Sequence, residues 1–332
     1  MNRVYIIIVN WNGGHDTVEC LESLLRLSYP SFTPVVCDNG SSDDSLEVIK
    51  RWAESRGLCY NEFSSTEVAY DSRSEADFPL VIIRSQMNLG FAGGSNVGMR
   101  YALARGDCDY VWLLNNDTVV DTDALTRLVE RIDLQPSVGM CGSTIRLYHD
   151  PDKIQALGGG YYFRWIGLPW HYGRFRIWGK KIDQRRAEMW MNYVEGASML
   201  ISRKFVEEIG LMCEDYFLYF EEADWAVRAK GRFKLAYARQ SIVYHKVGAS
   251  IGTSSNPAKK SMVCDYFNIR NRILFTKRFF PAALPTIYLG LLGALLVRLC
   301  LGRWGRVWMI IKLLFGYNDA QYEISAGCRT QT

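Results

Sequence analysis

The chain of 332 residues is 48% hydrophobic and 22% charged, which is typical of a globular protein with a large core, and it is longer than most single domains. Its net charge of +4 is too small to indicate a nucleic-acid partner. The nine cysteines lack zinc-site spacing and a disulfide framework, and residues 1–14 resemble a first strand and loop instead of a signal peptide. We therefore expect a cytosolic protein with reduced thiols.

The first 120 residues alternate short apolar runs with amphipathic stretches. The apolar runs predict strands at 3–10, 34–40, 79–85 and 110–116. Helical spacing and capping residues predict helices at 16–29, 41–57 and 96–106. The acidic, serine-rich segment 61–79 has little periodicity and is expected to be an exposed loop insertion. This order is typical of an α/β fold in which helices cover both faces of a mostly parallel sheet.

A polar loop follows each predicted strand, and the four loops read NWNGG, DNGSSD, NLGFAGGSN and NNDT. In a parallel sheet the carboxyl ends of the strands meet at one edge, where ligands bind. Each loop alone is also consistent with an ordinary turn, because Asn, Gly, Asp and Ser favour turns. Four such loops at one edge predict a nucleotide site.

Seven stretches between residues 4 and 250 resemble, in order, inverting family-2 glycosyltransferases of the GT-A fold, and most of all the rhamnosyltransferase-like branch. They are IIIVNWNGG, VVCDNGSSDDS, NLGFAGGSNVGMRYAL, VWLLNNDTVV, GASMLISRKFVEEIG, YFLYFEEADWAVRAKG and VYHKVGAS. The resemblance implies a catalytic domain over 1–255, divided into a nucleotide-sugar-binding half (1–120) and an acceptor half (121–255). A helical tail (256–332) would follow.

The resemblance implies a donor site for a dTDP- or UDP-sugar at the ends of the first strands. Asp38 matches the aspartate that contacts the base or ribose, and the backbone from Asn10 to Asn12 would line the base. Further residues would lie along the nucleotide, with glycines allowing close backbone approach: Asn88, Gly90, Phe91, Gly93, Gly94, Asn96 and Asn116.

Asn115 to Asp117 occupy the position of the family's metal-binding DxD motif, with Asn115 in place of the usual first aspartate. An amide oxygen can ligate a hard cation, but it adds no charge. The resemblance implies that Asp117, His245 and Asn115 hold Mg²⁺ or Mn²⁺ on the donor diphosphate. The alternative for His245 is an ordinary histidine at a strand end.

Three acids, Glu221, Glu222 and Asp224, stand at the start of a predicted helix, where the helix macrodipole alone would favour them. They stand at the positions of the family's Glu-Asp-x-Asp pattern, with Glu222 in place of the more usual Asp. The resemblance therefore implies that Glu222 is the general base, with Glu221 as the second choice. Asp224 completes the candidate catalytic group, although it is expected to orient the loop or to pair with Arg228, its i+4 neighbour.

The acceptor half contains small residues at 196–198 and many Trp, Tyr and Arg residues at 158–193, which suit a lining for sugar rings and phosphates. Packing of these residues on the core is the alternative.

The leading hypothesis is transfer of a sugar, with rhamnose favoured by the resemblance, to a glycan or polyprenyl-diphosphate-linked acceptor in cell-surface polysaccharide synthesis. A non-catalytic nucleotide-sugar-binding scaffold is the alternative function. A nucleotidyltransferase is disfavoured because the first loop lacks Arg and Lys.

The tail is apolar and basic. Residues 279–297 carry no charge, but Pro281 and Pro285 are expected to break the stretch, and 286–297 is too short to span a membrane. The residues that follow mix Arg with Trp and Leu, which predicts amphipathic helices on anionic lipid at the inner face of the cytoplasmic membrane. Core helices and a homodimer interface are the alternatives.

Overall fold

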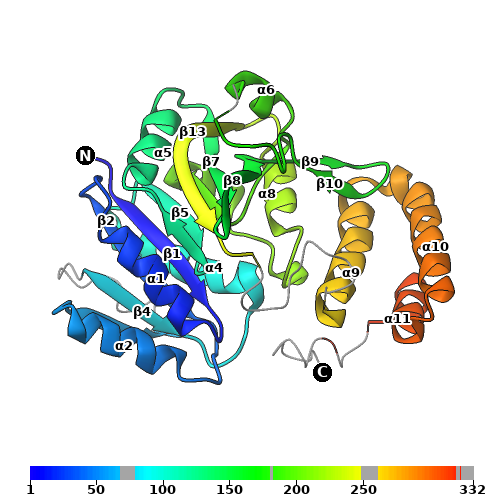
Figure 1. Cartoon of the computed structure of the whole chain (residues 1–332), viewed down its shortest axis with the longest axis horizontal. Helices are drawn as coiled ribbons and strands as arrows, with labels where there is room; N and C mark the ends of the chain where they lie inside the picture. The colour runs from blue at the N-terminus through cyan, green and yellow to red at the C-terminus, as the bar shows by residue number, and fades with distance from the viewer. Residues whose placement is uncertain (68–78, 180–181, 248–260, 319–321, 323–332) are drawn as a thin grey trace.

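The computed structural model in Figure 1 describes residues 1–67, 79–179, 182–247, 261–318 and 322. Within them, thirteen strands form one sheet, and its main path runs β10-β9-β8-β7-β12-β5-β1-β2-β4-β3. The strands are β1 (Val4–Asn10), β2 (Phe32–Asp38), β3 (Tyr60–Ser64), β4 (Leu80–Arg84), β5 (Tyr110–Asn115), β6 (Thr118–Val120), β7 (Val138–Leu147), β8 (Asp150–Leu157), β9 (Gly159–Phe163), β10 (Leu168–Trp170), β11 (Tyr193–Val194), β12 (Ser198–Ser202) and β13 (Lys234–His245).

The sheet has a parallel half and a mixed half. Five neighbouring strands run parallel to one another, as predicted for the nucleotide-binding half: β3, β4, β2, β1 and β5. Beyond them β12 pairs antiparallel with β5 and β7, and β13 runs parallel to β7 and antiparallel to β6. The β13–β6 pairing brings His245 opposite Thr118, next to the end of β5.

Helices cover both faces of the sheet. They are α1 (Gly14–Leu24), α2 (Ser45–Ser55), α4 (Gly90–Arg105), α5 (Ala124–Asp133), α6 (Gln184–Met189), α7 (Arg203–Ile209), α8 (Glu221–Ala229), α9 (Met262–Phe279), α10 (Leu284–Cys300) and α11 (Trp304–Leu314), with short 3₁₀ turns η1 (Glu214–Tyr216) and η2 (Pro281–Ala283). Strand β1 contacts both layers, because successive side chains of a strand point to opposite faces. Tyr5 and Ile7 pack with α4, α7 and α8, while Val4, Ile6 and Ile8 pack with α1, α2 and α5.

Two local predictions were wrong. The segment 61–79 was predicted to be a loop insertion, but its first residues, 61–64, belong to the parallel edge strand β3 beside β4, while 68–78 lie outside the described residues. The helix predicted at 96–106 begins at Gly90, so most of the loop after β4 is the first turns of α4. The aromatic segment 158–193 also contains regular structure, namely β9, β10, α6 and β11.

The C-terminal helices stand beside the catalytic part (Figure 1). Helix α9 joins it to the rest, because Phe275 lies in the main core while Phe267 and Ile273 pack with α10 and α11. Asp265 on α9 pairs with Arg298 of α10 (3.0 Å) and Arg306 near the start of α11 (2.6 Å). The predicted boundary at 255/256 lies outside the described residues.

Helix α10 corrects the expectation that prolines interrupt the apolar stretch. Pro285 occupies the first turn of α10, where a backbone N–H has no helical acceptor, so the helix continues without a break. In the described part of the chain, Pro281–Cys300 is the one helical segment whose length and apolar composition would suffice to cross a membrane, and 17% of it is buried. Its exposed side chains include Leu289, Leu292 and Leu296.

Candidate active site

Asp38 lies at the carboxyl edge of the parallel strands, where the sequence predicted a nucleotide site. The register of β1 and β2 places Asn10 opposite Asp38. The Asn10 side-chain amide donates to the Asp38 carboxylate (2.9 Å), and the Ser41 hydroxyl donates to the same oxygen (2.6 Å). Asp38 is buried but not ion-paired in these contacts, so its carboxylate is held in place by two neutral donors.

The loops on either side of Asp38 are tied to each other. Asn12 adopts a left-handed backbone (φ 50°), and its side-chain oxygen accepts from the Ser42 backbone N–H (2.8 Å). Thr17 donates to the Asn10 side-chain oxygen (2.8 Å) and accepts from the Asn116 amide (3.2 Å). The predicted residues Asn10, Asn12 and Asn116 therefore come together, and their amides build the frame of the loops.

Residues of the loop after β4 make close packing contacts and hydrogen bonds within the protein. A side chain at Gly94 would lie 2.8 Å from Val9 Cγ1, and one at Gly93 would lie 2.6 Å from Leu89 Cβ, so these glycines permit close packing of α4. The Asn96 amide donates to the Met212 carbonyl (2.9 Å) and to Glu214 (2.7 Å). These contacts give Gly93, Gly94 and Asn96 a packing role, and their place along a nucleotide stays a prediction.

Residues at the start of this loop contact the segment 217–220, which precedes Glu221 and Glu222. The Asn88 side-chain oxygen accepts from the Asn39 amide (2.8 Å) and the Gly90 N–H (2.9 Å). Gly90 needs its positive φ (72°), and a Cβ there would lie 2.2 Å from the Phe217 carbonyl oxygen. The Phe91 N–H donates to that oxygen (2.8 Å). Gly90 and Phe91 thus connect the donor side of the site to the 217–220 loop.

Asn115, Asp117 and His245 meet at the ends of β5 and β13. His245 Nε2 lies 3.1 Å from Asp117 Oδ1 and 3.4 Å from the Asn115 side-chain amide, while His245 Nδ1 faces Gln155 Oε1 (3.0 Å). Gln155 thereby orients the ring so that Nε2 points to the other two residues.

This set fits a divalent cation that also binds a diphosphate. It offers one carboxylate, one imidazole and one amide, ligand types that Mg²⁺ or Mn²⁺ accept, and its single negative charge leaves positions for phosphate oxygens. The described residues contain no group of three or more His, Cys, Asp or Glu side chains that could hold a metal by themselves. A cation here would need the Asn115 oxygen and the substrate as further ligands, and this ligand set stays a prediction.

The acids Glu221 and Glu222 open α8 after a strained loop. Phe217, Tyr219 and Phe220 all have positive φ (61°, 70° and 79°), a conformation that costs non-glycine residues free energy. Asn271 of α9 is fully buried, and its amide donates to the carbonyls of Tyr216 (2.7 Å), Leu218 (2.7 Å) and Tyr219 (3.1 Å). Helix α9 therefore holds the loop that positions the acidic pair.

The two glutamates have different surroundings. Glu221 is 2% exposed, and its Oε2 has no hydrogen-bond partner. Burial raises the pKa of Glu221 to about 7. Glu222 is partly exposed, and its Oε1 packs against Gly196, where a Cβ would lie 2.2 Å away. Desolvation of the Glu222 carboxyl, followed by the charges of Glu221 and Glu195, raises its pKa well above the ordinary value. Of the pair, Glu222 is the more exposed acid.

Asp224 is held by three donors within the protein. Its buried carboxylate accepts from the Tyr216 hydroxyl (3.0 Å), Arg228 Nε (2.6 Å) and Arg278 (3.4 Å). The expected i+4 pair with Arg228 is confirmed, and these contacts favour the structural role over the catalytic one. Asp224 anchors α8 to α9.

Comparison with known proteins agrees with this geometry. The family model described as Glycosyl transferase family 2 matches residues 5–210, more than half of the chain. The chain belongs to glycosyltransferase family 2. It is 23% identical over 323 residues to the Low-salt glycan biosynthesis hexosyltransferase Agl10 of Haloferax volcanii, covering 95% of this chain and 86% of the relative. A Poly-beta-1,6-N-acetyl-D-glucosamine synthase of Staphylococcus epidermidis is 26% identical over 157 residues, which cover 46% of this chain and only 32% of that one.

Two solved structures share the fold of this glycosyltransferase. The mannosyltransferase PcManGT from Pyrobaculum calidifontis, in complex with GDP-Man and Mn²⁺, has a TM-score of 0.56 at 15% identity and covers 94% of this chain and 85% of its own. GalNAc-T7 with UDP, GalNAc and Mn²⁺ has a TM-score of 0.62 at 14% identity, covering 99% of this chain and 55% of its own. At such identities the likeness concerns the fold, and it confirms the predicted GT-A architecture.

The structure adds Glu195 and His171, which sequence reasoning missed. Glu195 Oε2 lies 2.9 Å from His171 Nε2, and the Tyr193 hydroxyl lies 3.0 Å from the same nitrogen. Burial would raise the pKa of Glu195, but the charge and hydrogen bond of His171 outweigh it and hold that pKa below its usual value. Glu195 also interacts electrostatically with Glu222 and with His245. In the sequence, the only indication of these two residues was the acid at position 195, directly before the small-residue stretch 196–198.

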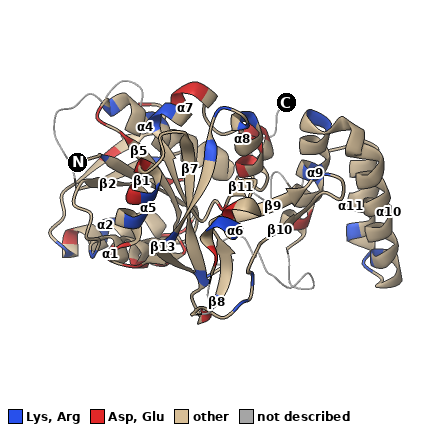
Figure 2. Cartoon of the chain, turned by 90° about the horizontal axis from the view of Figure 1, so that it is seen from above, with Lys and Arg blue, Asp and Glu red and all other residues tan. Residues whose placement is uncertain are grey.

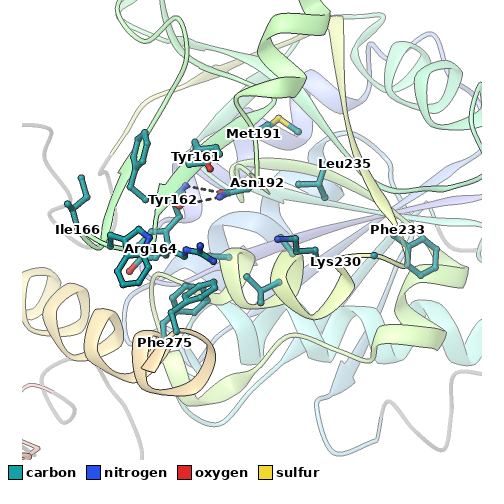
Figure 3. A pocket seen from close by; sticks show the side chains of 17 residues that line it. Tyr161, Tyr162, Arg164, Ile166, Met191, Asn192, Lys230, Phe233, Leu235 and Phe275 are labelled. Atoms are coloured by element: carbon teal, nitrogen blue, oxygen red, sulfur yellow. Dashed lines mark hydrogen bonds between the residues drawn. The ribbon is translucent and has the colours of Figure 1, made fainter. Parts of the chain in front are cut away.

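A cavity of about 670 Å³ lies behind α8 (Figure 3). Ala223, Ala226 and Lys230 of α8 and its C-terminal turn face it, together with aromatic side chains from β9 and α9 such as Tyr161 and Phe275. Neither Glu221 nor Glu222 lines this cavity, so it is separate from the acidic pair.

The burial of Glu221 leads to a prediction about stability and pH. Because its pKa is raised to about 7 in the folded protein, the stability it contributes is present below its ordinary pKa of 4.5 and is lost as pH rises toward 7. We expect the Tm of Glu221→Gln to exceed that of wild type increasingly between pH 5 and pH 8, by about 2–4 °C per kcal/mol lost. Glu47→Gln, at an exposed position of α2, is the control. Parallel Tm curves for Glu221→Gln and wild type would contradict the prediction.

Proposed function

We propose that the protein is an inverting glycosyltransferase that moves a sugar from a dTDP- or UDP-sugar to a glycan or lipid-linked acceptor in surface-polysaccharide synthesis. Glu222 accepts the proton of the acceptor hydroxyl as that oxygen attacks the anomeric carbon. Asp117, His245 and Asn115 would hold Mg²⁺ or Mn²⁺, which neutralises charge on the departing nucleoside diphosphate. Asp38 contacts the base or ribose of the donor.

The observation that carries the proposal is the arrangement of two chemically different groups around Glu195. One is the His245–Asp117 pair, with its 3.1 Å contact, and the other is the acid Glu222 beside Gly196. Glu195 interacts electrostatically with His245 and with Glu222. Inverting transfer needs a base and a charge-neutralising group, and these two groups support both roles.

The donor sugar is tested with a panel of nucleotide-sugars. Rhamnose is favoured by the sequence resemblance, while the names of similar proteins include mannose and N-acetylglucosamine, so the panel should contain all three. We expect a dTDP- or UDP-sugar to raise the Tm, since a ligand that binds only the folded state stabilises it. Slow hydrolysis of the same compound should require Mn²⁺ or Mg²⁺. Binding without any hydrolysis or transfer would instead support the non-catalytic scaffold.

We also propose that α10 and α11 lie against the cytoplasmic face of a membrane. The exposed leucines of α10, together with Trp304 and Trp308 of α11, form an apolar surface. Figure 2 shows basic residues on these helices, and Asp265 is the one acid within 261–318. Because Arg298 pairs with Asp265, α10 is held beside α9, which favours a helix lying on lipid over one that leaves the protein to span the bilayer.

The membrane proposal predicts that the full-length protein sediments with phosphatidylglycerol vesicles. Replacing both Leu289 and Leu292 with Glu should remove most of this binding, because carboxylates enter lipid at a high cost. Leu134→Glu, at a residue 79% exposed on the catalytic part, is the matched control and should sediment like wild type. If the double variant still sediments, the surface does not contact lipid. If wild type is a dimer without vesicles and the variant is a monomer, the surface is a homodimer interface instead.

A further inference from the structure

A second cavity, of about 530 Å³, lies between the segment that follows β10 and the helix α6. Three arginines and three aromatic residues dominate its lining: Arg174, Arg176, Arg186, Trp170, Tyr172 and Trp190. The segment belongs to the aromatic and basic stretch in which the sequence analysis expected acceptor contacts. A ligand of this cavity would have to suit both the arginines and the aromatic rings.

Three arginines line the cavity, and the charge of one of them, Arg174, acts on the Glu195 carboxylate. The guanidinium carbons of Arg176 and Arg186 lie 5.1 Å and 5.8 Å from the centre of the same ring, that of Tyr172, while that of Arg174 lies 4.9 Å from the centre of the Phe175 ring. All three arginine residues are exposed, and among the described residues none of their guanidinium groups has a carboxylate oxygen within 4.0 Å. An oxyanion with paired acceptor atoms suits such exposed guanidinium groups.

The aromatic residues present ring faces beside these charges. Trp170 and Trp190 pack edge to face with centroids 5.3 Å apart, and Trp170 is also 6.1 Å from Tyr172. Trp170 and Trp190 remain 42% and 37% exposed. Exposed rings with a fixed mutual angle provide apolar surfaces for a sugar ring at little entropic cost.

The cavity also reaches the acidic pair through two side chains. His171, which lines the cavity, contacts Glu195 at 2.9 Å, and Glu195 immediately precedes Gly196, against which Glu222 packs. A saccharide bound in this cavity would therefore lie beside His171, which is connected through Glu195 and Gly196 to the Glu222 carboxyl.

We propose that this cavity is the acceptor subsite and that the acceptor carries an oxyanion next to a sugar ring. Arg174, Arg176 and Arg186 bind the oxyanion, which is a phosphate or a uronate carboxylate, and Trp170 and Trp190 contact the ring. The proposal rests on the proposed transferase function, but anion binding is measurable without turnover.

The test measures binding of three probes to the full-length protein by calorimetry: glucose 6-phosphate, methyl glucuronide and methyl glucoside. Titrations are made with UDP or dTDP and Mn²⁺ already saturating, so that the donor site is not the one observed. We expect at least one anionic probe to bind at least ~10-fold more tightly than the neutral one, since a charge-assisted hydrogen bond is worth about one such factor. The better anionic probe identifies phosphate or carboxylate as the group, and its affinity should fall with salt.

Arg176→Gln and Arg186→Gln should each weaken binding of that probe ~10-fold. Arg185→Gln removes an exposed neighbouring charge that does not line the cavity and should change nothing. Nucleoside-diphosphate affinity should match wild type in all three variants, and Arg185→Gln should also match wild type in donor hydrolysis without acceptor.

Three results would overturn the subsite. One is equal affinity for the neutral and anionic probes. A second is anion binding that is insensitive to Arg176 and Arg186. Loss of nucleoside-diphosphate affinity in these variants would also overturn it, because the arginines would then belong to the donor. A wild type that binds anionic saccharides in the predicted way but neither hydrolyses nor transfers any nucleotide-sugar would leave the subsite intact and refute the transferase function.

Discussion

Replacing Glu222 with Gln is expected to slow sugar transfer by at least ~10²-fold while donor affinity stays within about twofold of wild type. Gln keeps the size of the side chain but cannot accept the proton of the acceptor hydroxyl. The donor contacts proposed for Asp38 and the metal group lie elsewhere, so the loss should fall on kcat. Initial rates with saturating donor, together with donor titrations, separate these two effects.

Two companion variants make this test specific. Glu221→Gln changes the neighbouring acid, which is 2% exposed and cannot reach an acceptor, so its kcat should fall far less. Glu222→Asp keeps a carboxylate but withdraws it from Gly196 by over ~1 Å, so partial activity is expected. A near-normal rate for Glu222→Gln together with an inactive Glu221→Gln would show that Glu221 is the base.

The base assignment also implies a pH dependence. Desolvation and the charges of Glu221 and Glu195 raise the pKa of Glu222, and the residue acts as a base only when it is deprotonated. The rate should therefore rise with pH through a higher value than is usual for a glutamate. In Glu221→Gln one of the raising charges is absent, so this rise should move to lower pH.

Asp117→Ala is the second change with a large expected effect. It removes the only carboxylate of the metal group and leaves the side chains of His245 and Asn115. We expect loss of most activity, ~10²-fold or more, and weaker binding of nucleoside diphosphate in the presence of Mn²⁺. Activity and diphosphate affinity, each measured over a range of Mn²⁺ concentrations, provide the readout.

The neighbouring position supplies the control for this experiment. Asn115→Asp adds a carboxylate 3.4 Å or so from His245 Nε2, where the amide now stands, and should bind the cation at least as tightly as wild type. Addition of excess EDTA should stop wild-type transfer, and activity should return with Mn²⁺ or Mg²⁺. Full activity in excess EDTA would show that no divalent cation is needed.

The sequence by itself determined the plan of the nucleotide-binding half. Strands β1, β2, β4 and β5 and the helices between them follow from hydrophobic period and capping residues, which are local properties. Because parallel strands share one carboxyl edge, their order also predicted that Asp38 and the Asn115–Asp117 turn would meet there. Strand β3 was missed because a short edge strand is defined by its pairing with β4 more than by its own residues.

Only the tertiary structure decided which polar side chains are available for chemistry. Asp224 and Glu222 are two residues apart and equally suited to a helix start, yet Asp224 meets Arg278, 54 residues away, while Glu222 meets Gly196. Glu195 has its role through His171, 24 residues earlier in the chain. The physical reason is that burial, ion pairing and pKa depend on what surrounds a side chain in space, and these neighbours come from parts of the chain that no local pattern connects.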